Sequence, residues 1–117
     1  MKTTILLCVA LLCGSDLASA AEMRCGWLRN PTPANWWLED SDGSWTIMTQ
    51  GGNDEPQGMD MIPDISEHDY VATNGNYGYA CACMRVETND DRHIMRIRSF
   101  TQMKLAKCEM DRKLPKP

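Results

Sequence analysis

Four cysteines constrain the fold of this chain more than any other feature. Cys81 and Cys83 are separated by one residue in a strand-like run, and Cys25 and Cys108 lie far away on either side. In a strand, side chains two residues apart share a face but stand about 6.5–7 Å apart, so a Cys81–Cys83 bond would need a distorted backbone. We expect each of the two to bond a distant cysteine, and we favour Cys81–Cys108 with Cys25–Cys83.

The first twenty residues have the pattern of a secretory signal peptide. Met1-Lys2 supplies the positive start, Thr3–Cys13 is apolar, and Ala18-Ser19-Ala20 has the small-x-small form of a cleavage site. Because Leu12, rather than a small residue, precedes Cys13, we expect a soluble exported protein and not a lipoprotein. Residues 21–117 should then form a single β-rich domain stapled by two disulfides, in the periplasm or outside the cell.

The charge pattern argues against a nucleic-acid partner. The chain has 12 Lys and Arg against 16 Asp and Glu, a net charge of −4. Residues 21–91 hold three arginines and thirteen acidic residues, whereas residues 92–117 hold eight basic and two acidic ones. An acidic protein is poorly suited to neutralising phosphates. No later apolar run reaches the roughly 18–20 residues needed to cross a bilayer, so we expect no transmembrane segment after signal cleavage.

A β-hairpin over residues 36–49 is the clearest local prediction. Asp42-Gly43 stands between two strand-forming runs, a combination that favours a two-residue type I′ turn. With that turn, Leu38 faces Ile47 and Trp36 faces Thr49. The face predicted to be buried carries Trp36, Leu38, Trp45 and Ile47.

A second hairpin and a long loop complete the predicted fold. Residues 21–35 are an extended lead-in, residues 51–69 an acidic loop, and Tyr77–Thr88 and His93–Met103 two strands joined by a turn. Centring this hairpin near residues 90–91 puts Cys81 nearer its open end, within reach of Cys108. A short helix is expected within Leu105–Leu114. The fold class is therefore mainly β, with small α+β as the alternative: two antiparallel hairpins in a compact sheet.

Several strings in the chain resemble a known family. They are Arg24-Cys25-Gly26-Trp27-Leu28, Asn30-Pro31-Thr32-Pro33-Ala34-Asn35-Trp36-Trp37-Leu38, Gly51-Gly52 and Tyr77-Gly78-Tyr79-Ala80-Cys81-Ala82-Cys83-Met84. Together they resemble the small exported bacterial proteins grouped as the domain of unknown function DUF4087, over nearly all of residues 21–117. The resemblance implies a bacterial periplasmic protein. It implies no activity, substrate or catalytic residue.

Residues suited to catalysis or metal binding are not grouped along the sequence. His68 lies in the acidic loop and His93 beside a turn, whereas nucleophilic catalysis needs an activated Ser or Cys next to a base. Met59, Met61 and His68 could offer soft ligands to copper, but methionine more often fills cores. We therefore expect a protein that is not an enzyme, with no catalytic residue, metal or cofactor. A small enzyme or metal carrier is the remaining alternative.

The candidate contact surface surrounds Trp37. The hairpin puts Trp37 on the face opposite the buried one, with Glu39 and Met48 beside it, and the acidic loop adds Asp60 and Asp64. Aromatic residues are enriched in binding hot spots. We expect a non-enzymatic binding protein, in the manner of an inhibitor or immunity protein, with a protein or cell-envelope partner. The alternative is a carbohydrate- or peptidoglycan-binding module that uses surface Trp and Tyr. The oligomeric state is left open.

Overall fold

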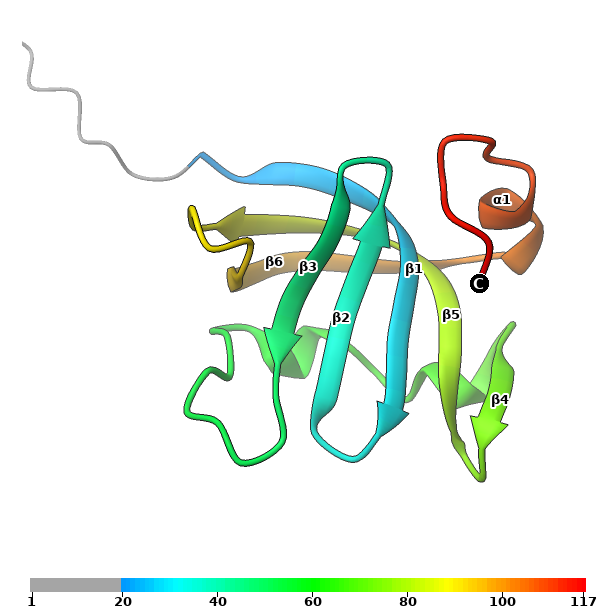
Figure 1. The fold of residues 1–117 in the computed structure, drawn as a ribbon, viewed down its shortest axis with the longest axis horizontal. Helices are drawn as coiled ribbons and strands as arrows, with labels where there is room; N and C mark the ends of the chain where they lie inside the picture. The colour runs from blue at the N-terminus through cyan, green and yellow to red at the C-terminus, as the bar shows by residue number, and fades with distance from the viewer. Residues whose placement is uncertain (1–19) are drawn as a thin grey trace, which may run out of the picture.

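The computed structural model describes residues 20–117, so the predicted signal peptide lies outside the described residues apart from Ala20. Within them the chain is mainly β, as predicted, with six strands and one short helix (Figure 1). The strands are β1 (Glu22–Thr32), β2 (Asn35–Asp40), β3 (Gly43–Met48), β4 (Val71–Asn74), β5 (Tyr77–Thr88) and β6 (Ile94–Met103). Two 3-10 turns, η1 (Met59–Met61) and η2 (Ile65–Glu67), precede β4, and helix α1 (Leu105–Glu109) follows β6.

The strands form one antiparallel sheet that curls back on itself. Its order is β3-β2-β1-β5-β4, and β6 also pairs with β5. The long strand β5 pairs with β1 along one edge, while its other edge pairs first with β4 and then with β6. Figure 1 shows β5 and β6 crossing behind β2 and β3. The Thr46 backbone N–H donates to the Arg92 carbonyl at 2.9 Å, which joins β3 to the segment that leads into β6.

The main core fills the inner face of this curled sheet. Leu28 of β1 stands between Leu38 of β2 and Ala80 of β5, and Leu38 stands opposite Trp45 of β3. All four side chains are buried. The other members of this core are Ile47, Ile65, Ala82, Met84, Val86, Ile94 and Ile97. The predicted buried face of the first hairpin is therefore confirmed, except that Trp36 is only half-buried at the edge of the core.

The acidic loop is present as predicted and covers the core. Gln57 inserts beside β6, where its N–H donates to the Met95 carbonyl and its carbonyl accepts from the Ile97 N–H, at 3.1 and 2.8 Å. Gly58 has φ of +78°, and a Cβ at this position would stand 2.1 Å from the Ile97 carbonyl oxygen. Glycine is therefore required where the loop crosses β6. Ile65 of η2 then enters the main core.

The predicted pairing of the first hairpin is wrong by two residues. Ser41 and Asp42 form the turn, so that Asp40 faces Gly43 and Leu38 faces Trp45. The reason is the Asp40 carboxylate, which accepts a hydrogen bond from the Asp42 N–H at 2.9 Å and closes the turn one residue earlier. Gly43, with φ of +121°, follows the turn.

Two further elements differ from the sequence expectation. The extended lead-in is the long strand β1, which lies between β2 and β5 in the sheet. The four-residue strand β4 was not expected. The predicted short C-terminal helix is confirmed as α1, after which the chain turns again at residues 112–114 and brings the Pro115 carbonyl back to the Trp27 indole N–H, at 2.9 Å.

The two disulfides have the favoured connectivity. Cys25 bonds Cys83, its direct partner across β1 and β5, and Cys81 bonds Cys108 of α1. The second bond anchors a small separate core. This core is made of Trp27, Cys81 and Cys108, with Tyr79, Met103, Leu105 and Leu114 packed around it.

Mass spectrometry of the purified protein under non-reducing conditions checks this connectivity. We expect no free thiol among these four cysteines and two cross-linked peptide pairs, Cys25–Cys83 and Cys81–Cys108, because the structure has these two disulfide bonds. The same digest after reduction is the control. A free Cys81 or Cys83 thiol would contradict the structural assignment and favour redox chemistry.

Candidate functional site

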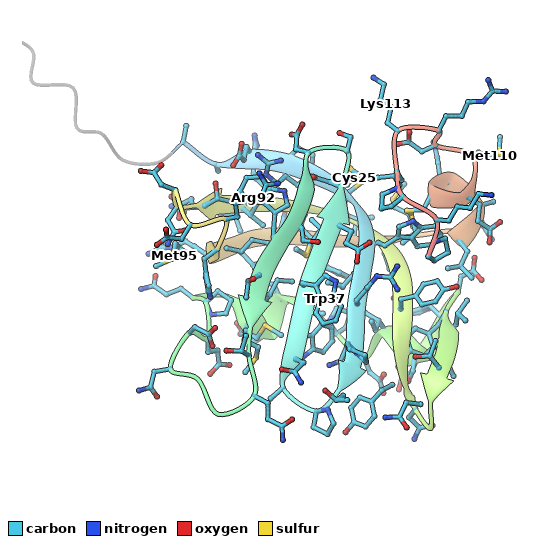
Figure 2. All side chains as sticks on the ribbon, in the orientation of Figure 1. Cys25, Trp37, Arg92, Met95, Met110 and Lys113 are labelled. Carbon is cyan, nitrogen blue, oxygen red and sulfur yellow. A yellow bond between two sulfur atoms is a disulfide. The ribbon has the colours of Figure 1, made fainter. Side chains whose placement is uncertain are left out.

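The outer face of the sheet carries a row of side chains across four strands. Tyr79 of β5 stands opposite Arg29 of β1, Arg29 opposite Trp37 of β2, and Trp37 opposite Thr46 of β3. Directly opposed residues in antiparallel strands project to the same face. We call Tyr79, Arg29, Trp37 and Thr46 the outer row. Figure 2 shows Trp37 near the middle of the sheet.

Glu39 holds the centre of the outer row in place. Its Oε1 accepts from the Trp37 indole N–H at 2.9 Å and lies 2.8 Å from Arg29 Nε. The side chains of Arg29 and Glu39 are each 19% exposed, so this ion pair is largely shielded from water. The Arg29 guanidinium carbon also lies 5.3 Å from the centroid of the Tyr79 ring. Trp37 is therefore a half-buried aromatic side chain fixed by a partner two residues away.

The structure separates the predicted contact residues into two groups. Trp37 and Glu39 touch on the outer face, whereas Met48 is half-buried and stands opposite Trp36, beyond an irregularity in the pairing of β2 with β3. Asp60 and Asp64 are exposed on the loop. Asp60 lies in a hollow lined by Arg96 and Arg98 of β6, and Asp64 lies in another lined by Trp36 and Tyr70.

Sequence reasoning missed one part of the outer row. Arg29 was not a candidate, because β1 was expected to be a lead-in and not a strand between two others. One signal in the sequence could have indicated Arg29. Trp27 and Arg29 are two positions apart, so they would share a face if this segment were a strand. Tyr79 belonged to the aromatic set that the sequence offers, but nothing there placed it beside Arg29.

Comparison with known proteins adds the family. The family described as "Protein of unknown function (DUF4087)" matches residues 19–115. The chain belongs to this family. The resemblance of the aromatic and cysteine-containing strings is thereby confirmed. No curated protein and no solved structure matches the chain.

Two properties of this DUF4087 chain bear on where it works. Both disulfides join segments distant in the sequence, which indicates an oxidising environment. Within residues 20–117, no helix combines the length and the apolar character needed to span a bilayer.

A second cluster in the DUF4087 chain surrounds Trp45 and has a structural role. The guanidinium carbons of Arg24 and Arg92 lie 3.7 and 4.3 Å from the centroid of its ring. Asp40 Oδ1 accepts from the Trp45 indole N–H at 3.0 Å, and Arg24 donates to Asp40 Oδ2 at 2.7 Å. Burial lowers the pKa of Arg24, but hydrogen bonds to Asp40 and Asp42 outweigh burial and leave that pKa above its ordinary value. The cluster joins β1, the first hairpin and the turn before β6.

A third cluster fastens the start of the long loop to β6. His93 Nε2 lies 3.3 Å from Asp54 Oδ2, and His93 Nδ1 lies 2.9 Å from the Ile94 carbonyl oxygen. Asp54 also accepts from the backbone N–H and the hydroxyl of Thr49. The Thr49 N–H is the main cause that lowers the pKa of Asp54, against the opposing effect of burial. Both imidazole nitrogens therefore lie beside oxygen atoms, and the cluster links the start of the long loop to the residue that precedes β6.

Proposed function

We propose that this protein acts after export, in the periplasm, as a non-enzymatic binding protein whose partner is another protein. The contact surface we propose is the outer row with Glu39 and Met48. The observation that supports it is the fixed position of Trp37, whose indole N–H is bonded to Glu39 while the side chain stays partly open to solvent. A fixed aromatic side chain loses little conformational entropy when it binds.

The composition of this surface favours a protein partner. Trp, Tyr, Arg and Met are the residue types enriched in the centres of protein–protein interfaces. The outer row supplies Trp37, Tyr79 and Arg29, and Met48 follows Thr46 by two residues in β3. An inhibitor or immunity role fits the size and the disulfides, although that is an analogy from protein class only.

A carbohydrate-binding role for the same surface is less well supported. Stacking against a sugar needs an open aromatic face. The Tyr79 ring already has Arg29 over it, and the Trp27 ring contacts it edge-on, with 5.4 Å between centroids. Trp37 alone would have to serve as the platform. Titration with muropeptides, followed by tryptophan fluorescence, tests this alternative directly.

Replacement of Trp37 by Ala should weaken partner binding without unfolding the protein. Trp37 is half-buried on the outer face, outside both cores, so we expect a loss of under about 1 kcal/mol in the free energy of unfolding, as is usual for surface changes. Loss of a hot-spot tryptophan should weaken binding by at least about thirty-fold, since such residues contribute roughly 2 kcal/mol or more.

The measurement is a periplasmic pull-down followed by titration of the captured partner against both proteins. Met23→Ala is the matched control, because Met23 is a 59% exposed apolar residue on β1 away from the outer row. Equal binding by the Trp37→Ala and Met23→Ala variants would refute the proposed surface.

A further inference from the structure

A hollow lined by aromatic side chains lies on the side of β2 opposite Trp37. Its volume is about 240 Å³, and Trp36, Tyr70 and Tyr77 line it. Trp36 comes from β2, Tyr70 immediately precedes β4, and Tyr77 begins β5. The tight turn at residues 75–76 and the end of the long loop therefore bring together rings that are distant in the sequence.

A carboxylate at the rim of this hollow is held in one position. Asp64 begins η2, and its Oδ1 accepts from the Ser66 N–H at 3.0 Å and from the Ser66 hydroxyl at 2.6 Å. These hydrogen bonds, the one from the hydroxyl first, lower the pKa of Asp64, so the group is ionised at neutral pH. Burial, and then the charge of Asp64, raises the pKa of Tyr70. The Asp64 charge therefore acts at the Tyr70 ring.

The polar groups around the hollow are mainly acceptors. Asn30 is 8% exposed and uses its Nδ2 to donate to the Thr32 and Asn35 carbonyls, both at 2.9 Å. Its amide oxygen is an acceptor. The Tyr70 hydroxyl donates to the Asn76 carbonyl at 2.8 Å, which leaves its oxygen as an acceptor as well. Among the described residues that line the hollow, Asp64 is the charged one.

We propose that this hollow binds the ammonium group of a small organic cation. Rings of Trp and Tyr attract a cation through their negative faces, and a nearby carboxylate strengthens that attraction. An anionic ligand is disfavoured, because it would be repelled by the Asp64 carboxylate and would find no positively charged side chain among the described residues of the lining. The volume lies below the roughly 300–1,000 Å³ of sites for drug-sized ligands, which restricts the occupant to one compact group. Choline headgroups and peptide lysines both present such a group.

This site is independent of the proposed protein-binding surface. Trp36 and Trp37 are adjacent in β2, and adjacent residues of a strand project to opposite faces. A ligand in the hollow would therefore leave the outer row free. Failure of one proposal does not affect the other.

Titration of the folded protein with choline, monitored by two-dimensional NMR, tests the site. We expect saturable shifts at the Trp36 indole N–H and at Tyr77. The neutral carbon analogue 3,3-dimethylbutan-1-ol should bind at least about ten-fold more weakly, because it lacks the charge that the rings and Asp64 attract. Parallel titration with N-acetyl-lysine methylamide distinguishes a quaternary headgroup from a peptide ammonium as the preferred source.

Asp64→Asn and Asp60→Asn are the matched variants. Asparagine keeps an oxygen that can accept from Ser66, so the start of η2 is preserved while the charge is lost. We expect Asp64→Asn to weaken choline binding by about ten-fold. Asp60→Asn removes the same charge from the same loop, but Asp60 lines a separate hollow. It should leave choline binding within about two-fold, since salt screens an exposed charge that does not contact the ligand.

Three outcomes would overturn the proposal. They are the absence of a saturable shift with choline, equal binding of the neutral analogue, and an equal effect of the two variants on choline binding. The neutral-analogue comparison uses the unmodified protein, so it decides the question even if Asp64→Asn does not fold.

Discussion

Replacement of Trp45 by Ala should lower the free energy of unfolding by roughly 3–5 kcal/mol, as large-to-small changes of buried aromatic residues do. Trp45 is 7% exposed and belongs to the main core. Its loss would leave a cavity there. It would also remove the ring that the guanidinium groups of Arg24 and Arg92 contact. The hydrogen bond from the Trp45 indole N–H to the Asp40 carboxylate would be lost as well.

Urea unfolding of three variants separates these contributions. Trp45→Phe keeps most of the packing and loses the hydrogen bond to Asp40. We expect its free energy of unfolding to fall by about 1–3 kcal/mol, since the buried Asp40 acceptor then has one partner fewer. Trp37→Ala is the control for a tryptophan on the same hairpin but on the outer face. A Trp45→Ala protein as stable as Trp37→Ala would show that the cluster around Trp45 does not hold the hairpin to the sheet.

The second hairpin could be predicted from the sequence because its signals are local. The alternation of Tyr77–Thr88 and the turn residues after it define a strand and its return without reference to the rest of the chain. The even-numbered residues of β5 do face the main core. The hairpin geometry in turn favoured the Cys81–Cys108 bond, because it fixed which of the two cysteines lies nearer the end of β6.

The first hairpin shows why faces are easier to predict than pairing. The turn lies one residue earlier than expected, and β2 residues 37–40 therefore face β3 residues two positions earlier, whereas Trp36, beyond an irregularity, faces Met48, one position earlier. Because side chains alternate with a period of two, a shift of two residues leaves the side chains of residues 37–40 on their predicted faces. The choice between the two turns depends on the Asp40 carboxylate, which is fixed by Arg24 of a different strand.

Strand β1 could not be predicted because both of its faces are covered. Leu28 lies in the main core and its neighbour Trp27 in the small core, so polar and apolar residues do not alternate. Gly26 lacks a side chain because a Cβ there would stand 1.9 Å from the Glu39 carbonyl oxygen. Without β1 the sequence offers no reason to place Arg29 beside Trp37. The outer row therefore required the structure, although Trp37 itself did not.

Removal of the Cys81–Cys108 bond in a Cys81→Ala/Cys108→Ala variant should destabilise the small core selectively. The bond closes a sequence separation of 27 residues, for which the chain-entropy model gives roughly 3–4 kcal/mol. Residues 104–117 are otherwise attached by a few contacts, including the Leu105 N–H to Asp69 at 2.7 Å and the Trp27 indole N–H to the Pro115 carbonyl. Figure 1 shows this segment lying beside β1 and β5.

Tryptophan emission and hydrogen exchange distinguish local from global loss. When residues 104–117 detach, Trp27, which is now 1% exposed, should become hydrated and shift the emission to longer wavelength, while amides of β5 and β6 stay protected because the main core is intact. Cys25→Ala/Cys83→Ala is the control, since that bond joins strands already paired side by side. It should lower stability without exposing Trp27. If Trp27 stays buried in the Cys81→Ala/Cys108→Ala protein, packing alone holds the C-terminal segment, and the disulfide is not its anchor.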